Sequence, residues 1–133
     1  MPAQTLDPHT SPGGYEMPRI ADYTVLIDNS FSLSLAGSIT RNFDFTLPAD
    51  TQLDNAVLFF MVETGPANVQ FSVAVNGAVQ AVLTYNDREL HSAHEVVDGL
   101  LPVGINTVTF TVLAGGGTAE IGDVVLFFQR DIP

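Results

Sequence analysis

Apolar and polar residues alternate with a period of two along most of the chain after residue 22. In the segment 107–113, for example, Val108, Phe110 and Val112 alternate with threonines. A period of two is typical of a β-strand with one buried face. The pattern predicts strands at 23–28, 31–35, 40–47, 55–63, 69–76, 78–85, 107–113 and 118–130, and a short strand at 94–97 within an otherwise polar loop at 86–98.

Turn signals separate these segments. The pair Asn76-Gly77 between two apolar runs predicts a tight β-hairpin, and Gly115-Gly116-Gly117 is interpreted as a second hairpin turn. No segment has a helical period. We therefore predict an all-β fold: a single antiparallel two-sheet β-sandwich with jelly-roll topology and about eight strands.

The first 21 residues differ from the rest of the chain. They contain four prolines and the pair Gly13-Gly14, and they show no strand or helix period. We predict an extended N-terminal arm at 1–21 and the sandwich at 22–133. The start of the chain lacks the basic and apolar regions of a signal peptide, and no apolar run reaches the roughly 18 residues of a membrane span.

Composition limits the partners. Hydrophobic residues make up 46% of the 133 residues, enough for a core, and charged residues only 14%. Fifteen acidic residues stand against four arginines and no lysine, which gives a net charge of -11. Such a surface repels phosphate, so we expect neither nucleic acid nor membrane as a partner. The absence of cysteine excludes disulfides and thiolate metal sites.

Two stretches resemble a known family. The sequence FSVAVNG at 71–77 is a strand that ends in Val-Asn-Gly, and LLPVGINTVTF at 100–110 places Leu, Gly and Asn before another strand. Together with a last strand at 121–128, these stretches resemble the galactose-binding-domain-like jelly rolls. The resemblance covers residues 23–130 and implies the fold. Domains of this kind bind sugars, bind proteins or support assembly, so it leaves the function open.

Two predicted strands are apolar on both faces. Residues 57–62 read VLFFMV and residues 124–128 read VVLFF, so large apolar side chains must lie on an outer face in either register. This face is covered either by the arm or a loop of the same chain, or by another subunit. We develop the alternative of another subunit, and predict an assembly interface formed by Leu58, Phe60, Val62, Val125, Phe127, Tyr15 and Pro18.

Other candidate sites are less distinctive. A sugar could be recognised by the loop after a strand, at Tyr85, Asn86, Asp87 and Arg88. His91 and His94 offer imidazole ligands for a metal, although on a strand they point apart. Acidic and amide oxygens near strand ends could hold a structural calcium ion, at Asp28, Asn29, Asp123 and Asp131. The main prediction remains no metal and no cofactor.

Catalysis is not predicted. The chain has no Gly-x-Ser-x-Gly motif, and the glycine run at 115–117 lacks the lysine of a phosphate loop. We expect a non-enzymatic structural protein that forms homo-oligomers and joins a larger protein shell. The concrete version is a virion component such as a phage capsid decoration (cement) protein, made in the cytoplasm and located in a virion or other extracellular assembly. The alternative is a carbohydrate-binding module of galactose-binding type, with a glycan as ligand.

Overall fold

The computed structural model describes residues 18–86 and 88–131, which contain strands, turns and loops and no helix. No segment of this described part could therefore cross a membrane as a helix. The strands are β1 (Arg19–Ser34), β2 (Thr40–Phe45), β3 (Thr51–Gly65), β4 (Val69–Val75), β5 (Ala78–Tyr85), β6 (Leu90–Val97), β7 (Asn106–Ala114) and β8 (Thr118–Asp131).

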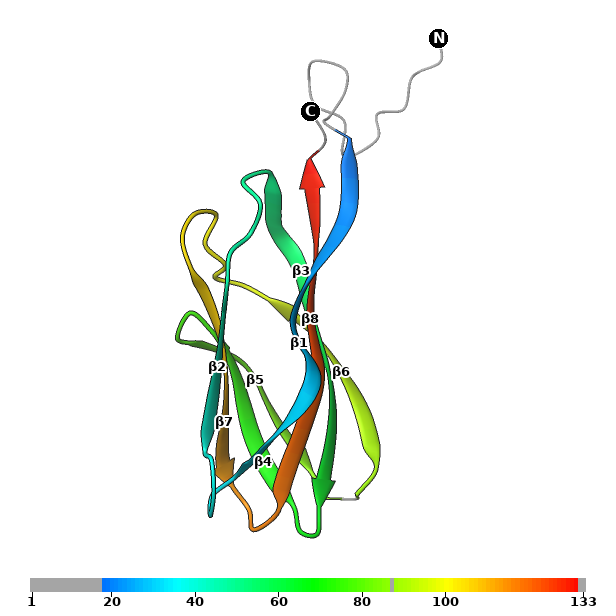
Figure 1. Cartoon of the computed structure of the whole chain (residues 1–133), viewed down its shortest axis with the longest axis vertical. Coiled ribbons are helices and arrows are strands. Elements are labelled where there is room, and N and C mark those ends of the chain that lie inside the picture. Colours follow the sequence, from blue (N-terminus) through cyan, green and yellow to red (C-terminus); the bar gives the residue numbers. More distant parts are fainter. Residues whose placement is uncertain (1–17, 87, 132–133) are drawn as a thin grey trace, which may run out of the picture.

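The strands form two four-stranded antiparallel sheets that face each other (Figure 1). Sheet A has the order β1-β8-β3-β6 and sheet B the order β2-β7-β4-β5. Only β4 and β5 are both consecutive in the described chain and hydrogen-bonded to each other; the other connections cross between the sheets. This order is that of an eight-stranded jelly roll. The predicted fold class is confirmed.

Strand β1 differs from the prediction, because the segments 23–28 and 31–35 belong to one long strand. Its pairing with β8 shifts register between Val25 and Ile27 and again between Ile27 and Ser30. The polar pair Asp28-Asn29 lies in this irregular part and was misread as a strand end. Since β1 begins at Arg19, the predicted boundary after residue 21 falls inside the strand; residues 1–17 lie outside the described part.

Two loop predictions are also corrected. The polar segment 86–98 carries a full strand, β6, whose Ala93 and Val97 face the core while Ser92 and His94 are exposed. The glycine run 115–117 is not a hairpin turn, because it carries the chain from β7 in sheet B to β8 in sheet A. There the Gly117 N–H donates to the Asn68 carbonyl at 3.2 Å.

The predicted hairpin at Asn76-Gly77 is confirmed. Both residues have positive φ, 50° and 86°, as a two-residue turn between antiparallel strands requires. The Asn76 side-chain amide also makes hydrogen bonds outside the turn. Its Nδ2 donates to the Gly99 carbonyl and to Asn106 Oδ1, both at 2.9 Å. The Val-Asn-Gly and Gly-Ile-Asn sequences that resemble the family thus join two loops at one end of the sandwich.

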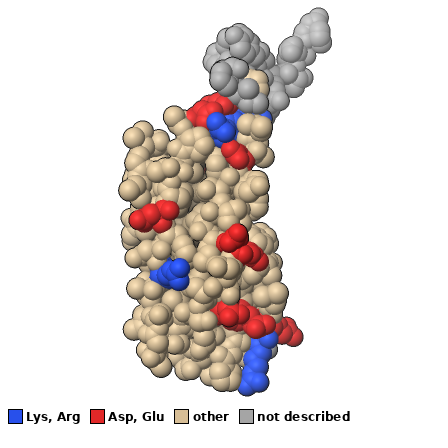
Figure 2. Space-filling view, viewed as in Figure 1, with Lys and Arg blue, Asp and Glu red and all other residues tan. Residues whose placement is uncertain are grey.

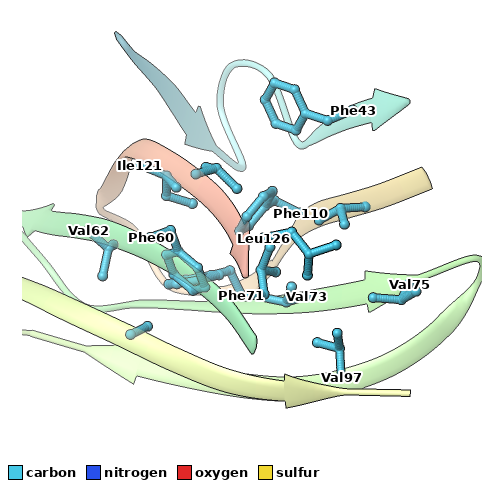
Figure 3. Packing of buried hydrophobic residues seen from close by; sticks show 14 of the residues in the cluster. Phe43, Phe60, Val62, Phe71, Val73, Val75, Val97, Phe110, Ile121 and Leu126 are labelled. Atoms are coloured by element: carbon cyan, nitrogen blue, oxygen red, sulfur yellow. The ribbon is translucent and has the colours of Figure 1, made fainter. Parts of the chain in front are cut away.

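The core lies between the sheets and contains a cluster of phenylalanines (Figure 3). Phe110 of β7 is fully buried and packs edge-on against Phe60 of β3 and Phe31 of β1, at ring-centroid distances of 5.2 and 5.6 Å. Edge-to-face pairs of this kind add about 0.5–1.5 kcal/mol each to the gain from burial. The rings therefore hold the two sheets together.

Candidate functional site

The outer face of sheet A is apolar over its middle part. Directly paired residues share a face, and the pairing arranges the outer side chains of β1, β8, β3 and β6 in rows. The first row is Tyr23, Phe127, Val57 and Val96. The second is Val25, Val125, Phe59 and His94. The third is Ser30, Gly122, Met61 and Ser92, and the fourth is Ser32, Glu120, Glu63 and Leu90.

We define the apolar face by the large nonpolar side chains of the first three rows. Val96 is 63% exposed, Tyr23 59% and Phe127 46%. With strands about 4.8 Å apart and about 3.3 Å per residue, the three rows span about 20 by 20 Å, or about 400 Å², of which the large nonpolar side chains occupy about two thirds, or about 270 Å². Its members are Tyr23, Val25, Val57, Phe59, Met61, Val96, Val125 and Phe127.

The outer face of sheet B is polar by contrast. The outward residues of β7 are three threonines, which hydrogen-bond to side chains of β2, and the exposed Leu113 at the end of the strand. Thr107 Oγ1 donates to Asp44 and Thr109 Oγ1 donates to Asn42, each at 2.7 Å. Val82 of β5 is an exposed nonpolar residue of sheet B, at 51%. The two broad faces of the molecule therefore differ in chemistry.

A groove of about 410 Å³ lies along the third and fourth rows of sheet A. It exists because Gly122 has no side chain beside Met61, and because β8 is irregular there, with Asp123 at a φ of 50°. A Cβ at Gly122 would approach the Asn29 carbonyl oxygen to 3.0 Å, so the close approach of β1 and β8 favours glycine there. The groove is lined by Ser30, Phe59, Met61, Glu63, Leu90, Glu120, Gly122 and Asp123.

A second, more polar hollow of about 380 Å³ adjoins the groove. Both are bordered by Glu63 and Glu120, which pair across β3 and β8. The second hollow continues to the loop after β3 and to the exposed side chain of Arg88. Carboxylates and one guanidinium therefore border the apolar face at the end formed by the fourth row.

The predicted interface residues divide into two groups. Val125 and Phe127 lie on the outer face of sheet A, as predicted. Leu58, Phe60 and Val62 do not: each is 0% exposed and packs in the core, so this part of the prediction is wrong. The outward residues of β3 are the alternate set, Val57, Phe59 and Met61. Pro18 is exposed just before β1, and Tyr15 lies outside the described residues.

The four predicted sugar-binding residues do not form one platform in the described structure. The Tyr85 ring is half-buried and stacks on the His91 ring at 4.4 Å, which occupies a ring face that a sugar would need. Asn86 is exposed, Arg88 lines the second hollow, and Asp87 lies outside the described residues.

The predicted metal ligands are also dispersed. On β6, His91 contacts Tyr85 on the inner side, whereas His94 lies against Phe59 on the outer side, with ring centroids 4.9 Å apart. Asp131 accepts a hydrogen bond from Gln52 at 2.6 Å and pairs with Arg19 at 3.5 Å. Within residues 18–86 and 88–131, no group of three His, Cys, Asp or Glu side chains could hold a metal ion.

The remaining calcium candidates lie at the irregular pairing of β1 with β8. Asp28 and Asn29 fall between the pairs Ile27–Val124 and Ser30–Gly122, and Asp123 falls opposite them. All three side chains are exposed. The backbone irregularity accounts for their polar character, and calcium binding there stays a prediction.

Charged side chains gather at the end of the molecule where β1 begins and β8 ends (Figure 2). Arg130 donates to Asp50 at 2.9 Å and to Asp22 at 3.1 Å. The hydrogen bond from the Arg130 guanidinium lowers the pKa of the Asp50 carboxyl below its usual value. The sequence gives no signal for this cluster, because its members are far apart in the chain.

Comparisons with known proteins agree with this architecture. No protein-family model matches the chain, and no curated protein matches it by sequence. The crystal structure of dimeric latent PorU from Porphyromonas gingivalis is similar over 85% of this chain, with a TM-score of 0.66 and 11% identity. The chain corresponds to only 13% of the length of PorU.

Two carbohydrate-binding modules are more distantly similar. One is the CBM36-1 domain of a multidomain xylanase from the hindgut metagenome of Trinervitermes trinervoides, with a TM-score of 0.48, 11% identity, and coverage of 81% of this chain and 96% of that one. The other is a family 35 module from an environmental isolate, with a TM-score of 0.48, 14% identity, and coverage of 89% and 95%. These identities show the fold alone. The fold is a two-sheet jelly roll, the architecture that the sequence resemblance implied.

Proposed function

We propose that this protein is a non-enzymatic assembly subunit that binds protein surfaces through the apolar face of sheet A. The observation that carries the proposal is the contrast between this face and the polar outer face of sheet B. Its nonpolar part of about 270 Å² approaches the range of about 300–600 Å² at which the largest apolar patch of a monomer is often functional. A face that contributed only to folding would be polar outside, as the threonine-bearing strands β2 and β7 of sheet B are.

The area indicates how strong the contact is. Burying about 270 Å² of nonpolar surface at about 25 cal/mol per Å² contributes about 7 kcal/mol. Association costs about 4–15 kcal/mol in lost translational and rotational freedom. The apolar face alone therefore supports a weak complex, and a stable one requires further contacts. This is the behaviour of a subunit that binds in many copies or through a second element.

The concrete form of the proposal is a virion component, such as a decoration (cement) protein on a phage capsid. Such a protein works by burying surface against its neighbours. The acidic, lysine-free chain, with a net charge of -11, suits protein contacts better than contacts with nucleic acid or anionic lipid. The partners would be further copies of the chain and a larger shell, outside the producing cell once the assembly is released.

The test compares two matched valine variants. Val96 and Val82 lie on edge strands of opposite sheets and have similar exposure, 63% and 51%. In Val96→Glu a buried charge would oppose assembly, whereas Val82→Glu leaves the apolar face intact. We expect the solution mass from light scattering, measured over a range of concentrations, to fall towards that of the monomer for Val96→Glu only. Equal masses for both variants and the unchanged protein would contradict the proposal.

Carbohydrate binding is the second candidate, and the hollow beside Arg88 favours it. Hydroxyl-rich ligands are bound by carboxylates and guanidinium groups, and Glu63, Glu120 and Arg88 supply both around one hollow of about 380 Å³. A glycan array separates the candidates. A specific sugar whose binding is lost in Arg88→Ala and retained in Val96→Glu would favour the module. No binding to any glycan would remove this candidate.

A further inference from the structure

We infer that the apolar face of sheet A is covered by residues 1–17 of a second copy of the chain, so that subunits are joined by exchanged N-terminal segments. The inference rests on the proposed assembly function and names the partner. The face and the segment meet at β1, because β1 is an edge strand of sheet A and begins at Arg19, directly after Pro18. Every copy thus carries both the face and the segment.

The direction of the chain favours a neighbour over the same molecule. The described chain begins at Pro18, just before the start of β1, and a residue before proline disfavours the helical backbone that would turn the chain back at once. The nearest turn signal is Pro12-Gly13-Gly14, which is about 17 Å beyond Arg19 in an extended chain. A segment that reversed there would travel away from its own apolar face before it could return.

The length of the segment limits that return. From Gly13 back to Met1 an extended chain spans about 40 Å, so it would reach about 23 Å along β1 past Arg19. The third row, which contains Ser30 and Met61, lies about 36 Å from Arg19 along the strand. The segment of the same chain would therefore leave the groove uncovered. The segment of a second copy can approach from another side and is not limited in this way.

Charge favours a segment over direct stacking of two sheets. Stacking with like ends together would bring the carboxylates of two copies close, because Glu63, Glu120 and Asp123 border the groove at one end of the face. The N-terminal segment has only two carboxylates, Asp7 and Glu16, in seventeen residues. It adds less like charge to the same surface.

The composition of the segment also fits an occupant of a sheet face. Prolines at positions 2, 8 and 12 lack N–H groups, so the segment is unsuited to extend the sheet as a paired strand. Proline-rich segments adopt extended conformations that lie on apolar surfaces through their side chains. Leu6, Tyr15 and Met17 supply the large side chains for such a contact. The area that the segment buries adds to that of the apolar face, which alone supports only a weak complex.

The experiment uses the absence of native cysteine, which makes every engineered thiol unique. One population of full-length protein carries Leu6→Cys or Tyr15→Cys, and a second population with a larger tag carries Met61→Cys or Val25→Cys. The two are mixed, allowed to exchange, oxidised and separated on a non-reducing gel. Val82→Cys on the outer face of sheet B is the control for random collision.

We expect disulfides between differently tagged chains to form at least about tenfold faster with the sheet A cysteines than with Val82→Cys, because a bound segment raises the effective concentration. Three results would overturn the inference. These are no disulfide from either segment position, equal rates with the control, or a double variant Leu6→Cys/Val25→Cys that closes only within one chain. If Val96→Glu still lowers the solution mass, the assembly function stands while this inference fails.

Discussion

The Asn106 side chain is the site where one substitution should reveal how the loops at one end of the sandwich are fixed. It is 0% exposed and makes three hydrogen bonds. Its Oδ1 accepts from Leu101 N–H at 2.6 Å and from Asn76 Nδ2 at 2.9 Å, and its Nδ2 donates to the Leu101 carbonyl at 3.1 Å. These bonds hold the loop between β6 and β7 to the β4–β5 turn.

Replacing Asn106 with alanine removes all three bonds at once. At a net value of about 1 kcal/mol each, the free energy of unfolding should fall by about 3 kcal/mol. With an unfolding entropy of about 2.1 cal/mol/K per residue, this corresponds to a decrease in Tm of about 10 °C for a chain of this length. The loss is local in origin, but two-state unfolding makes it visible in the whole domain.

Thermal unfolding followed by circular dichroism measures this loss. Asn42→Ala is the matched control, because Asn42 is exposed and its side chain accepts one described bond, from Thr109. We expect its Tm to change by no more than about 2 °C. If Asn106→Ala shifts the Tm by less than about 3 °C, the amide bonds do not fix the loop and the reasoning is wrong.

Two further predictions concern the core and the charged cluster. Phe110→Ala should lower the free energy of unfolding by about 3–5 kcal/mol in urea titrations, because it removes a fully buried ring that contacts three others; a loss below about 1.5 kcal/mol would mean that the core rearranges to fill the space. The Asp50 carboxyl has a lowered pKa in the folded state, so its pairing with Arg130 stabilises the protein at pH values above the unfolded pKa, and this contribution is lost as the pH falls through the folded pKa. Asp50→Asn should therefore show a smaller decrease in Tm between pH 5 and pH 2 than the unchanged protein, and identical pH profiles would argue against the pairing.

The sequence predicted the strands well where one face is apolar and the other polar. In β7 the threonines could only face solvent, and the Asn76-Gly77 turn set the register of the neighbouring hairpin. Strand β6 was underestimated because its outward residues include Ser92 and His94, which give it the composition of a loop. Its buried residues, Ala93 and Val97, have small side chains. Alternation of small nonpolar residues with polar ones is a weak signal of a strand.

The apolar face could be predicted only in part. A strand such as β3, with large apolar residues on both sides, gives no indication of which side is inward, because a shift of one residue exchanges the two faces. The choice between Leu58, Phe60 and Val62 and their neighbours depended on pairing with β8 and β6, which is a long-range property. In β1 the alternation points the wrong way, because the nonpolar Tyr23 and Val25 lie outward while Thr24 faces the core beside Leu126.

The inequality of the two broad faces has a geometric consequence for anything built from this subunit. A copy held by the face of sheet A turns the outer face of sheet B to the solvent, where the threonines of β7 bind side chains of β2. The exposed nonpolar residues of that sheet are Val79, Val82 and Leu113, fewer than on the face of sheet A. Growth sideways is therefore favoured over growth upwards. Each subunit consists of two sheets packed about 10 Å apart. The assembly would therefore be a layer one molecule thick, and its outer surface would be hydrated at any number of subunits.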